Sequence, residues 1–109
     1  MTRGDRERLA DIAEAIRRIR EIVTRVPQID DVARDAILYN LVIIGEATKH
    51  VGVEERERRP EIPWRRIAGL RDLLTHEYFR IEIDAIRKIV DRDLPALERA
   101  ISELRRAER

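Results

Sequence analysis

Cysteine is absent from this chain of 109 residues, and aromatic residues are scarce, at one Trp, one Phe and two Tyr. The lack of cysteine excludes disulfides, thiol nucleophiles and thiolate metal sites, and it fits the reducing cytoplasm, where we expect the protein to work. The core must be filled by Ile, Leu, Val and Ala. Such an aliphatic core suits packed helices better than a small sheet, so we expect a single all-α domain over residues 1–109.

Several kinds of site are missing as well. The N-terminus lacks the apolar run of a signal peptide, and no stretch approaches the roughly 18 apolar residues of a membrane-spanning helix. The four glycines are isolated, so neither a P-loop nor a dinucleotide fingerprint exists. Ser102, the only serine, has no histidine near it in sequence, and the two histidines show no zinc spacing. The sequence therefore predicts no membrane partner, no metal and no cofactor.

Charge is abundant but balanced. Charged residues make up 41% of the chain, but the formal net charge is only +1. The net charge alone therefore does not indicate a nucleic-acid partner. Nearly every basic residue is arginine, whose guanidinium forks onto phosphate or carboxylate where lysine acts as a point charge. Surface pairing of Arg with Glu and binding of phosphate groups are both compatible with this composition.

Apolar residues recur at steps of three and four along the chain, which predicts amphipathic helices. We expect helices over residues 6–26, 31–51, 63 to 78 or 79, 83–90 and 94–106. The charged stretch over 53–63 is compatible with a short helical turn, but we expect a mainly exposed connection there. Asp30 and Asp31 can cap the second helix, Gly52 stops it, and Asp93 caps the last helix. The core candidates of the third helix are Ile67, Leu70, Leu73 and Leu74.

The second helix carries the widest apolar face and should lie at the centre of the fold. Gly45 lies in its middle, where glycine costs up to about 1 kcal/mol relative to alanine. Two explanations remain open. The glycine allows another helix to cross closely, or the neighbouring Glu46 contributes to a functional site.

Residues 71–78 gather an arginine, one of two histidines and one of two tyrosines: Arg71, His76 and Tyr78. In a helix, Arg71 and His76 lie roughly 140° apart, whereas Tyr78 falls within roughly 20° of Arg71, two turns further on. A compact pocket then needs either a helix that ends at His76 or a second copy of the helix across a two-fold axis, which means a homodimer. A simpler interpretation is a helix-end histidine, a surface ion pair of Arg71 and a core ring of Tyr78.

The pattern R-x4-H-x-Y formed by these three residues resembles that of the HEPN ribonucleases, and specifically of the small HepT-like toxins that are paired with minimal nucleotidyltransferase antitoxins. Residues 36–47, 62–71 and 93–95 are also similar to that family in order and spacing. The resemblance thus covers nearly the whole chain. It implies an up-and-down bundle of four to five helices that dimerises with its motif helices facing each other.

The resemblance implies a metal-independent endoribonuclease that attacks RNA through the ribose 2′-hydroxyl. His76 would move protons near neutral pH, and Arg71 would hold the phosphate and its developing charge. Asp72 stands where the family has a polar residue and could orient either group, although its negative charge opposes a polyanionic substrate. The candidates for contacts to RNA phosphates are the nearby Arg65, Arg66, Arg80 and Arg87.

The resemblance also implies a partner. In the family the nucleotidyltransferase antitoxin transfers AMP to the motif tyrosine, here Tyr78, and the added bulk and charge would block Arg71 and His76. We therefore expect the toxin of a type VII-like toxin–antitoxin pair. Two rivals stay open: a catalytically weak HEPN domain that serves mainly as partner and substrate of the nucleotidyltransferase, and a structural helical protein whose motif is coincidental.

Overall fold

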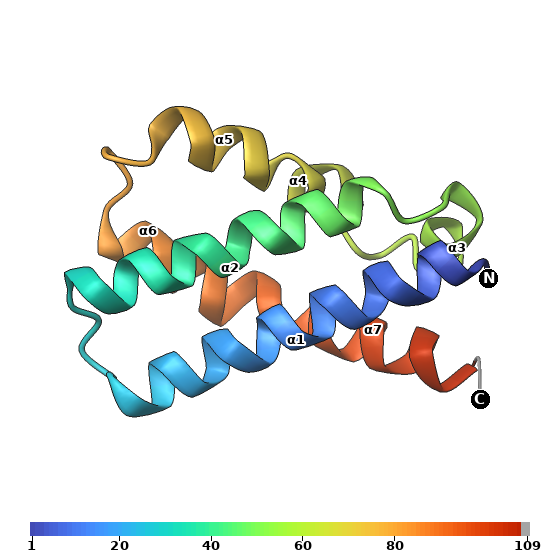
Figure 1. The fold of residues 1–109 in the computed structure, drawn as a ribbon, viewed down its shortest axis with the longest axis horizontal. Coiled ribbons are helices and arrows are strands. Elements are labelled where there is room, and N and C mark those ends of the chain that lie inside the picture. The colour runs from blue at the N-terminus through green and yellow to red at the C-terminus, as the bar shows by residue number, and fades with distance from the viewer. Residues whose placement is uncertain (108–109) are drawn as a thin grey trace.

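Helices account for most of residues 1–107, which are the residues that the computed structural model describes, and no strand occurs among them. In chain order they are α1 (Arg3–Arg25), α2 (Asp31–Lys49), α3 (Val53–Glu57), α4 (Trp64–Ala68), α5 (Leu70–Glu77), α6 (Ile83–Lys88), a π-helical turn η1 (Ile89–Asp93) and α7 (Leu94–Ala107) (Figure 1). This architecture confirms the predicted all-α fold.

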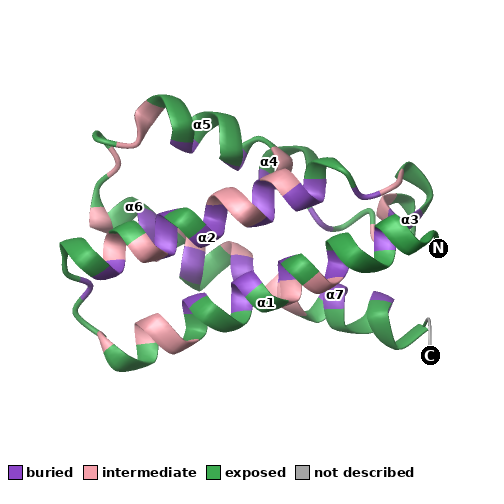
Figure 2. Ribbon diagram, in the orientation of Figure 1, coloured by how far each residue is buried: buried purple, intermediate pink, exposed green. Residues whose placement is uncertain are grey.

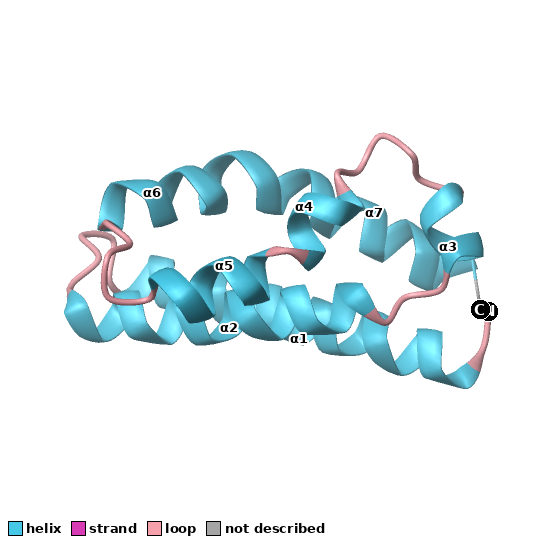
Figure 3. Ribbon diagram, turned by 90° about the horizontal axis from the view of Figure 1, so that it is seen from above, coloured by secondary structure: helices cyan, strands magenta, loops and turns pink. Residues whose placement is uncertain are grey.

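The long helices alternate in direction, as in an up-and-down bundle (Figure 1). α1 pairs with α2, α7 packs against α1, and α4 and α5 both pack against α2. The view from above shows α6 running along the other side of the bundle from α1 and α2 (Figure 3). The core between the helices is aliphatic, and the helical turns that face it are buried (Figure 2). No helix in residues 1–107 is both long and apolar enough to cross a membrane.

The start of α1 is tied to the segment that follows α2. α1 begins at Arg3, earlier than predicted, because Thr2 and Asp5 form a capping box. The Asp5 carboxylate also accepts the Gly52 N–H at 2.9 Å. This contact corrects the role predicted for Gly52, whose φ of −62° is not a left-handed stop and whose added Cβ would lie 3.3 Å from both carboxylate oxygens of Asp5. α2 itself ends at Lys49 rather than at residue 51.

The segment over 53–63, predicted as a mainly exposed connection, contains α3 and contributes to the interior. Glu55 is only 1% exposed, and its carboxylate lies 3.3 Å from an Arg58 nitrogen. Ile62 is also buried, and the Trp64 indole that follows donates to the Arg59 carbonyl at 2.9 Å. Most of the segment is exposed, as predicted, and only Glu55 and Ile62 within 53–63 are buried. Their burial was not predicted, because a paired, buried carboxylate and a solvated one look the same in a charged stretch of sequence.

The helix predicted over 63–78 is divided at Gly69 into α4 and α5. Both halves lie against the middle of α2. An added Cβ at Gly45 would stand 2.7 Å from the Arg71 backbone nitrogen and 3.2 Å from the Ile67 carbonyl oxygen. Only glycine permits such an approach, so the close crossing predicted for Gly45 is confirmed, and it brings the backbone of α5 directly against α2.

The chain from Ile83 to Ala107 is continuously helical, and the predicted separation into two helices with Asp93 as a cap is wrong. The Leu94 N–H bonds to the Ile89 carbonyl, five residues back, and Pro95 then supplies no N–H at all. A π-helical turn accommodates the missing donor inside the helix. The Asp93 carboxylate instead pairs with Arg66 of α4.

Candidate active site on helix α5

α5 is an amphipathic helix that lies on the outside of the bundle (Figure 1). Leu70 and Leu74 are buried and hold it in place. Leu73 was predicted to join them in the core, but it is 53% exposed because it lies roughly 100° around the helix from Leu74, beyond the face that α2 covers. The polar residues of the motif occupy the remaining faces.

Arg71 lies on the flank of α5 nearer α2, between two carboxylates. Its Nε is 3.5 Å from Glu46 Oε2 of α2, and its Nη1 is 3.2 Å from Asp72 Oδ1 of its own helix. The other oxygen of Glu46 lies 3.2 Å from His50 Nε2. The structure therefore brings Glu46 beside Arg71, as the sequence had left open, and it adds His50, which sequence reasoning did not connect with the motif.

His76 is exposed and its ring is held in one orientation. Its Nδ1 lies 2.7 Å from the Asp72 carbonyl oxygen, one turn back in the same helix. A carbonyl oxygen only accepts hydrogen bonds, so Nδ1 carries the proton in this contact. Nε2 has no partner among residues 1–107. In neutral imidazole Nε2 therefore carries the free lone pair and faces solvent, which is the arrangement required of a general base.

Arg71 and His76 of one chain do not converge. α5 does not end at His76 but runs to Glu77, and Tyr78 keeps a helical φ of −46° and ψ of −48°. The two side chains therefore keep the separation of roughly 140° that five helical residues impose. The first of the two predicted routes to a compact pocket, a helix that ends at His76, is ruled out.

Tyr78 is half-buried near the start of α2, on the same flank of α5 as Arg71. Arg34 of α2 lies over its ring, with 5.3 Å from the guanidinium carbon to the ring centroid. Tyr78 also lines a hollow of about 620 Å³ together with Asp31, Asp35 and residues 79–82. Burial raises the pKa of Tyr78, and the hydrogen-bonded carboxylate of Asp35 raises that pKa further, while the charge of Arg34 opposes both. The hydroxyl is thus protonated at neutral pH and borders an open space.

The four arginines predicted to meet RNA lie in different surroundings. Arg65 is exposed, whereas Arg66 is paired with Asp93 of η1. Arg87 donates to the Pro27 carbonyl at 3.0 Å. Arg80 is 86% exposed, and its ion pair with Glu77, three residues back, is long at 4.0 Å. Arg80 is therefore the one that combines a largely free guanidinium with a position just past His76.

Two residues of α1 that sequence reasoning missed lie near Arg71. Arg8 and Asp11 line a hollow of about 280 Å³ together with Glu46 and Arg71. No local pattern could have linked them, because Arg8 and Asp11 lie far from Arg71 in the sequence. Arg8 makes no ion pair within residues 1–107, so its guanidinium adds positive charge beside Arg71.

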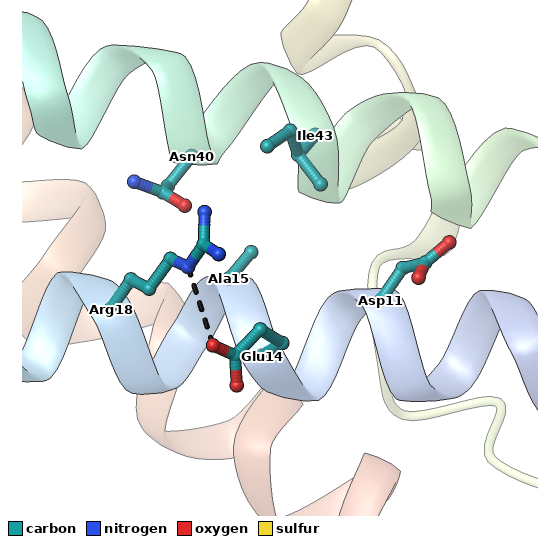
Figure 4. Close-up of a pocket in the computed structure, with 6 residues that line it drawn as sticks. All are labelled: Asp11, Glu14, Ala15, Arg18, Asn40 and Ile43. Atoms are coloured by element: carbon teal, nitrogen blue, oxygen red, sulfur yellow. Dashed lines mark hydrogen bonds and ion pairs between the residues drawn. The ribbon is translucent and has the colours of Figure 1, made fainter.

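A second hollow of about 170 Å³ lies between α1 and α2, and Figure 4 draws the residues that line it. Asp11 and Ile43 line both hollows. Asn40 is 4% exposed, donates to the Ala36 carbonyl at 2.8 Å, and has an unpaired Oδ1. Arg18 reaches toward it while bonded to Glu14 at 3.3 Å (Figure 4). The two hollows are therefore neighbours along the seam between α1 and α2. Among residues 1–107, no cluster of three or more His, Asp or Glu side chains forms a candidate metal site.

Comparisons with known proteins identify the family. The profile of the HepT-like ribonuclease family matches residues 12–104. A protein of Thermococcus cleftensis named "Probable ribonuclease HepT" is 39% identical over 111 residues, which cover 97% of this chain and 100% of that protein. A protein of Caldanaerobacter subterraneus, named as a candidate RNase, is 39% identical over 80 residues, 73% of this chain and 71% of its own. No solved structure gave a significant match. The chain belongs to the HepT-like ribonuclease family.

Proposed function

We propose that this protein is a metal-independent endoribonuclease of the HEPN type in which His76 and Arg71 act on the RNA phosphodiester. The observation that carries the proposal is the state of His76: an exposed imidazole, held by a 2.7 Å hydrogen bond at Nδ1, with Nε2 free. It lies five residues from an arginine in a chain of a ribonuclease family. Neither the fold nor the arginine alone would indicate this reaction.

In the proposed reaction the ribose 2′-oxygen attacks the adjacent phosphorus. A bond forms between the 2′-oxygen and phosphorus, the bond from phosphorus to the 5′-oxygen breaks, and the products are a 2′,3′-cyclic phosphate and a 5′-hydroxyl. Nε2 of His76 either accepts the proton of the 2′-hydroxyl or donates one to the leaving 5′-oxygen. The Arg71 guanidinium binds the phosphoryl oxygens as their negative charge grows.

The complete site requires a second copy of the chain. Because Arg71 and His76 of one chain point roughly 140° apart, a single chain cannot place both on one phosphate. Two copies related by a two-fold axis with their α5 helices face to face would place the arginine of one copy near the histidine of the other. We therefore propose a homodimer with a composite cleft.

Glu46 and Asp72 favour a second candidate function. Both carboxylates already lie within 3.5 Å of Arg71 nitrogens, so a phosphate must compete with them. They orient the guanidinium, but they also lower its attraction for a polyanion. The second candidate is therefore a weak nuclease whose main task is to bind its nucleotidyltransferase and to be its substrate.

Tyr78 is the proposed site of AMP transfer by a minimal nucleotidyltransferase antitoxin, with ATP as the AMP donor. In this step the Tyr78 oxygen loses its proton and bonds to the α-phosphorus of ATP, and pyrophosphate leaves. It lines an open hollow of about 620 Å³ and lies on the flank of α5 that carries Arg71. An adenylyl group there would add negative phosphate near the active site of the proposed toxin. Intact-mass analysis of the protein produced with its nucleotidyltransferase should show one or more added AMP groups, and Tyr78→Phe should remove them. AMP that persists on the Tyr78→Phe protein would contradict the assignment.

The nuclease proposal is tested by cleavage of single-stranded RNA with purified variants in the presence of a chelator. We expect His76→Ala and Arg71→Ala each to lower the rate at least about a hundredfold, because each removes a proton carrier or the phosphate-binding charge. Arg99→Ala, which removes an exposed arginine of α7, is the control and should cleave as the wild type does. Circular dichroism should show that all three variants remain folded.

Two outcomes would decide against the nuclease. Cleavage that survives both α5 substitutions would place the activity elsewhere or in a contaminant. A wild-type protein that cleaves no RNA but still binds its nucleotidyltransferase would favour the second candidate.

A further inference from the structure

Phe79 is the most exposed large apolar side chain in residues 1–107, with 95% of its surface accessible. A phenylalanine ring in water needs an explanation when it is the only phenylalanine of the chain and directly follows the motif. The ring also has a defined orientation, because it meets the Tyr78 ring edge to face, with 5.4 Å between centroids and 75° between planes.

The turn that carries Phe79 is held by Arg34 of α2. The Arg34 guanidinium donates to the Tyr78 carbonyl and twice to the Ile81 carbonyl, at 3.1 Å from Nε and 2.9 Å from Nη2. These carbonyls follow the last turn of α5, where no N–H of the helix is left to bond them. Arg34 is itself only 14% exposed and is anchored by Asp35 at 2.9 Å. Arg34 therefore fixes the turn over 78–81, which carries the exposed ring of Phe79.

Phe79 and His76 share the outward face of α5. The backbone keeps its helical sense past the end of the helix, since the Arg80 N–H bonds to the Glu77 carbonyl at 2.8 Å. Residues three apart on such a backbone lie roughly 60° apart, with about 5–6 Å between Cβ atoms. The free Nε2 of His76, the Phe79 ring and the exposed Arg80 guanidinium thus form one continuous surface.

We propose that Phe79 is a stacking platform for an RNA base next to the linkage that His76 acts on. This inference rests on the proposed ribonuclease function. Proteins bind single-stranded nucleic acid by combining aromatic rings, on which bases stack, with cations that meet the phosphates. Phe79 supplies the ring and Arg80 the cation, while Arg34 is the positioning residue that fixes the turn. The occupant is a base of single-stranded RNA, because inside a duplex the neighbouring stacked bases cover both faces of a base.

The proposal is tested by binding of a fluorescent single-stranded oligoribonucleotide to full-length protein that carries His76→Ala, so that the RNA stays uncut. In this background Phe79→Leu should weaken binding by about five- to a hundredfold, and Phe79→Trp should preserve it. Tyr39→Leu removes another exposed aromatic ring, from α2, and is the matched control that should bind within about twofold of the parent.

Salt dependence separates stacking from charge. Phe79→Leu should leave the slope of the logarithm of affinity against the logarithm of salt unchanged, whereas Arg80→Gln should reduce that slope by about one. A scan of abasic sites along the oligonucleotide should find one position whose loss weakens binding in the parent but not in Phe79→Leu, because the two changes remove the same contact.

Three results would overturn the proposal. Phe79→Leu that binds like its parent would leave the ring without a role in RNA binding. Weakened binding with no sensitive abasic position would mean that no base contacts the ring. A parallel fall in binding and in the molar mass measured by sedimentation would make Phe79 a contact between copies of the chain. The ribonuclease function is judged separately, by cleavage with the wild-type chain, so either hypothesis can fail alone.

Discussion

At the scale of single residues, Tyr78 shows how neighbours set the chemistry of one side chain. Its ring contacts the Arg34 guanidinium and meets the Phe79 ring edge to face. Burial and the Asp35 carboxylate both disfavour the phenolate, so the pKa of Tyr78 lies above its ordinary value of 10.0. A nucleotidyltransferase that uses this hydroxyl as a nucleophile must therefore take a proton from it.

The first prediction concerns this pKa. The rise of tyrosinate absorbance with pH, measured in a Tyr39→Phe background, should place the Tyr78 pKa above 10.0, and Asp35→Asn should lower it without abolishing the contribution of burial. Because the pKa of Tyr78 is higher in the folded than in the unfolded chain, the protonated hydroxyl contributes to the stability of the folded state. This contribution is fully present below about pH 10 and is lost as pH rises through the folded-state pKa. Asp31→Asn, which changes another carboxylate of the same hollow, should have the smaller effect.

At the scale of helices, the crossing of α2 and α5 determines where Arg71 and Glu46 meet. Gly45 removes the Cβ that would otherwise separate the two backbones, and the next residue, Glu46, then reaches Arg71 at 3.5 Å. Of the two interpretations left open for this part of α2, the close crossing is confirmed, and the contribution of Glu46 to a functional site stays a prediction. Gly45 allows the two helices to approach closely, and the side chain of Glu46 can therefore pair with Arg71.

Gly45→Ala should destabilise the protein by about 1–2 kcal/mol. Overpacking costs about 1–3 kcal/mol, and the better helix propensity of alanine returns up to about 1 kcal/mol. RNA cleavage should fall as well, because the obstructed atom is the backbone nitrogen of Arg71. Gly4→Ala is the control: its Cβ would meet only the Thr2 hydroxyl oxygen at 3.7 Å, so stability should hold or rise. Urea unfolding measures the stability of both variants, and an unchanged unfolding midpoint for Gly45→Ala would contradict the argument.

At the scale of the whole molecule, α5 is a single-layer addition to the outside of the bundle. It packs against α2 and touches α4, and Asp72, His76 and Phe79 face outward. Leu73 borders an apolar groove of about 270 Å³ whose other lining residues are Arg66, Ile67, Gly69, Leu70, Ile89 and Asp93. An exposed leucine at the rim of an apolar groove is the kind of surface that the proposed dimer would bury.

Leu73→Glu should weaken self-association by about tenfold or more, since it places a charge in a contact that buries apolar surface. RNA cleavage should fall with the fraction of dimer. Val53→Glu, at a similarly exposed apolar residue of α3, should change neither property. Sedimentation equilibrium measures the association directly. A Leu73→Glu protein that remains dimeric and active would move the interface away from this face of α5.

The sequence by itself determined the all-α fold, the two long helices α1 and α2, most of the residues that face the core, and the spacing of Arg71, His76 and Tyr78 along α5 and its end. These are local properties, set by periodicity, caps and the 3.6-residue turn. Asp30, for example, caps α2 as predicted, accepting the Ala33 N–H at 2.8 Å. Periodicity did not show that Leu73 would be exposed, because that depends on how much of α5 its neighbours cover.

Only the tertiary structure decided which distant groups meet. Arg34 reaches the turn after α5 from 47 residues away, Gly52 bonds to Asp5 across the same separation, and Arg8 of α1 lies in one hollow with Arg71. Each contact depends on the packing of helices that no local pattern orients. The support of the Phe79 turn by Arg34 and the position of Arg71 beside Glu46 follow from that packing, and so they could not be predicted from the chain alone.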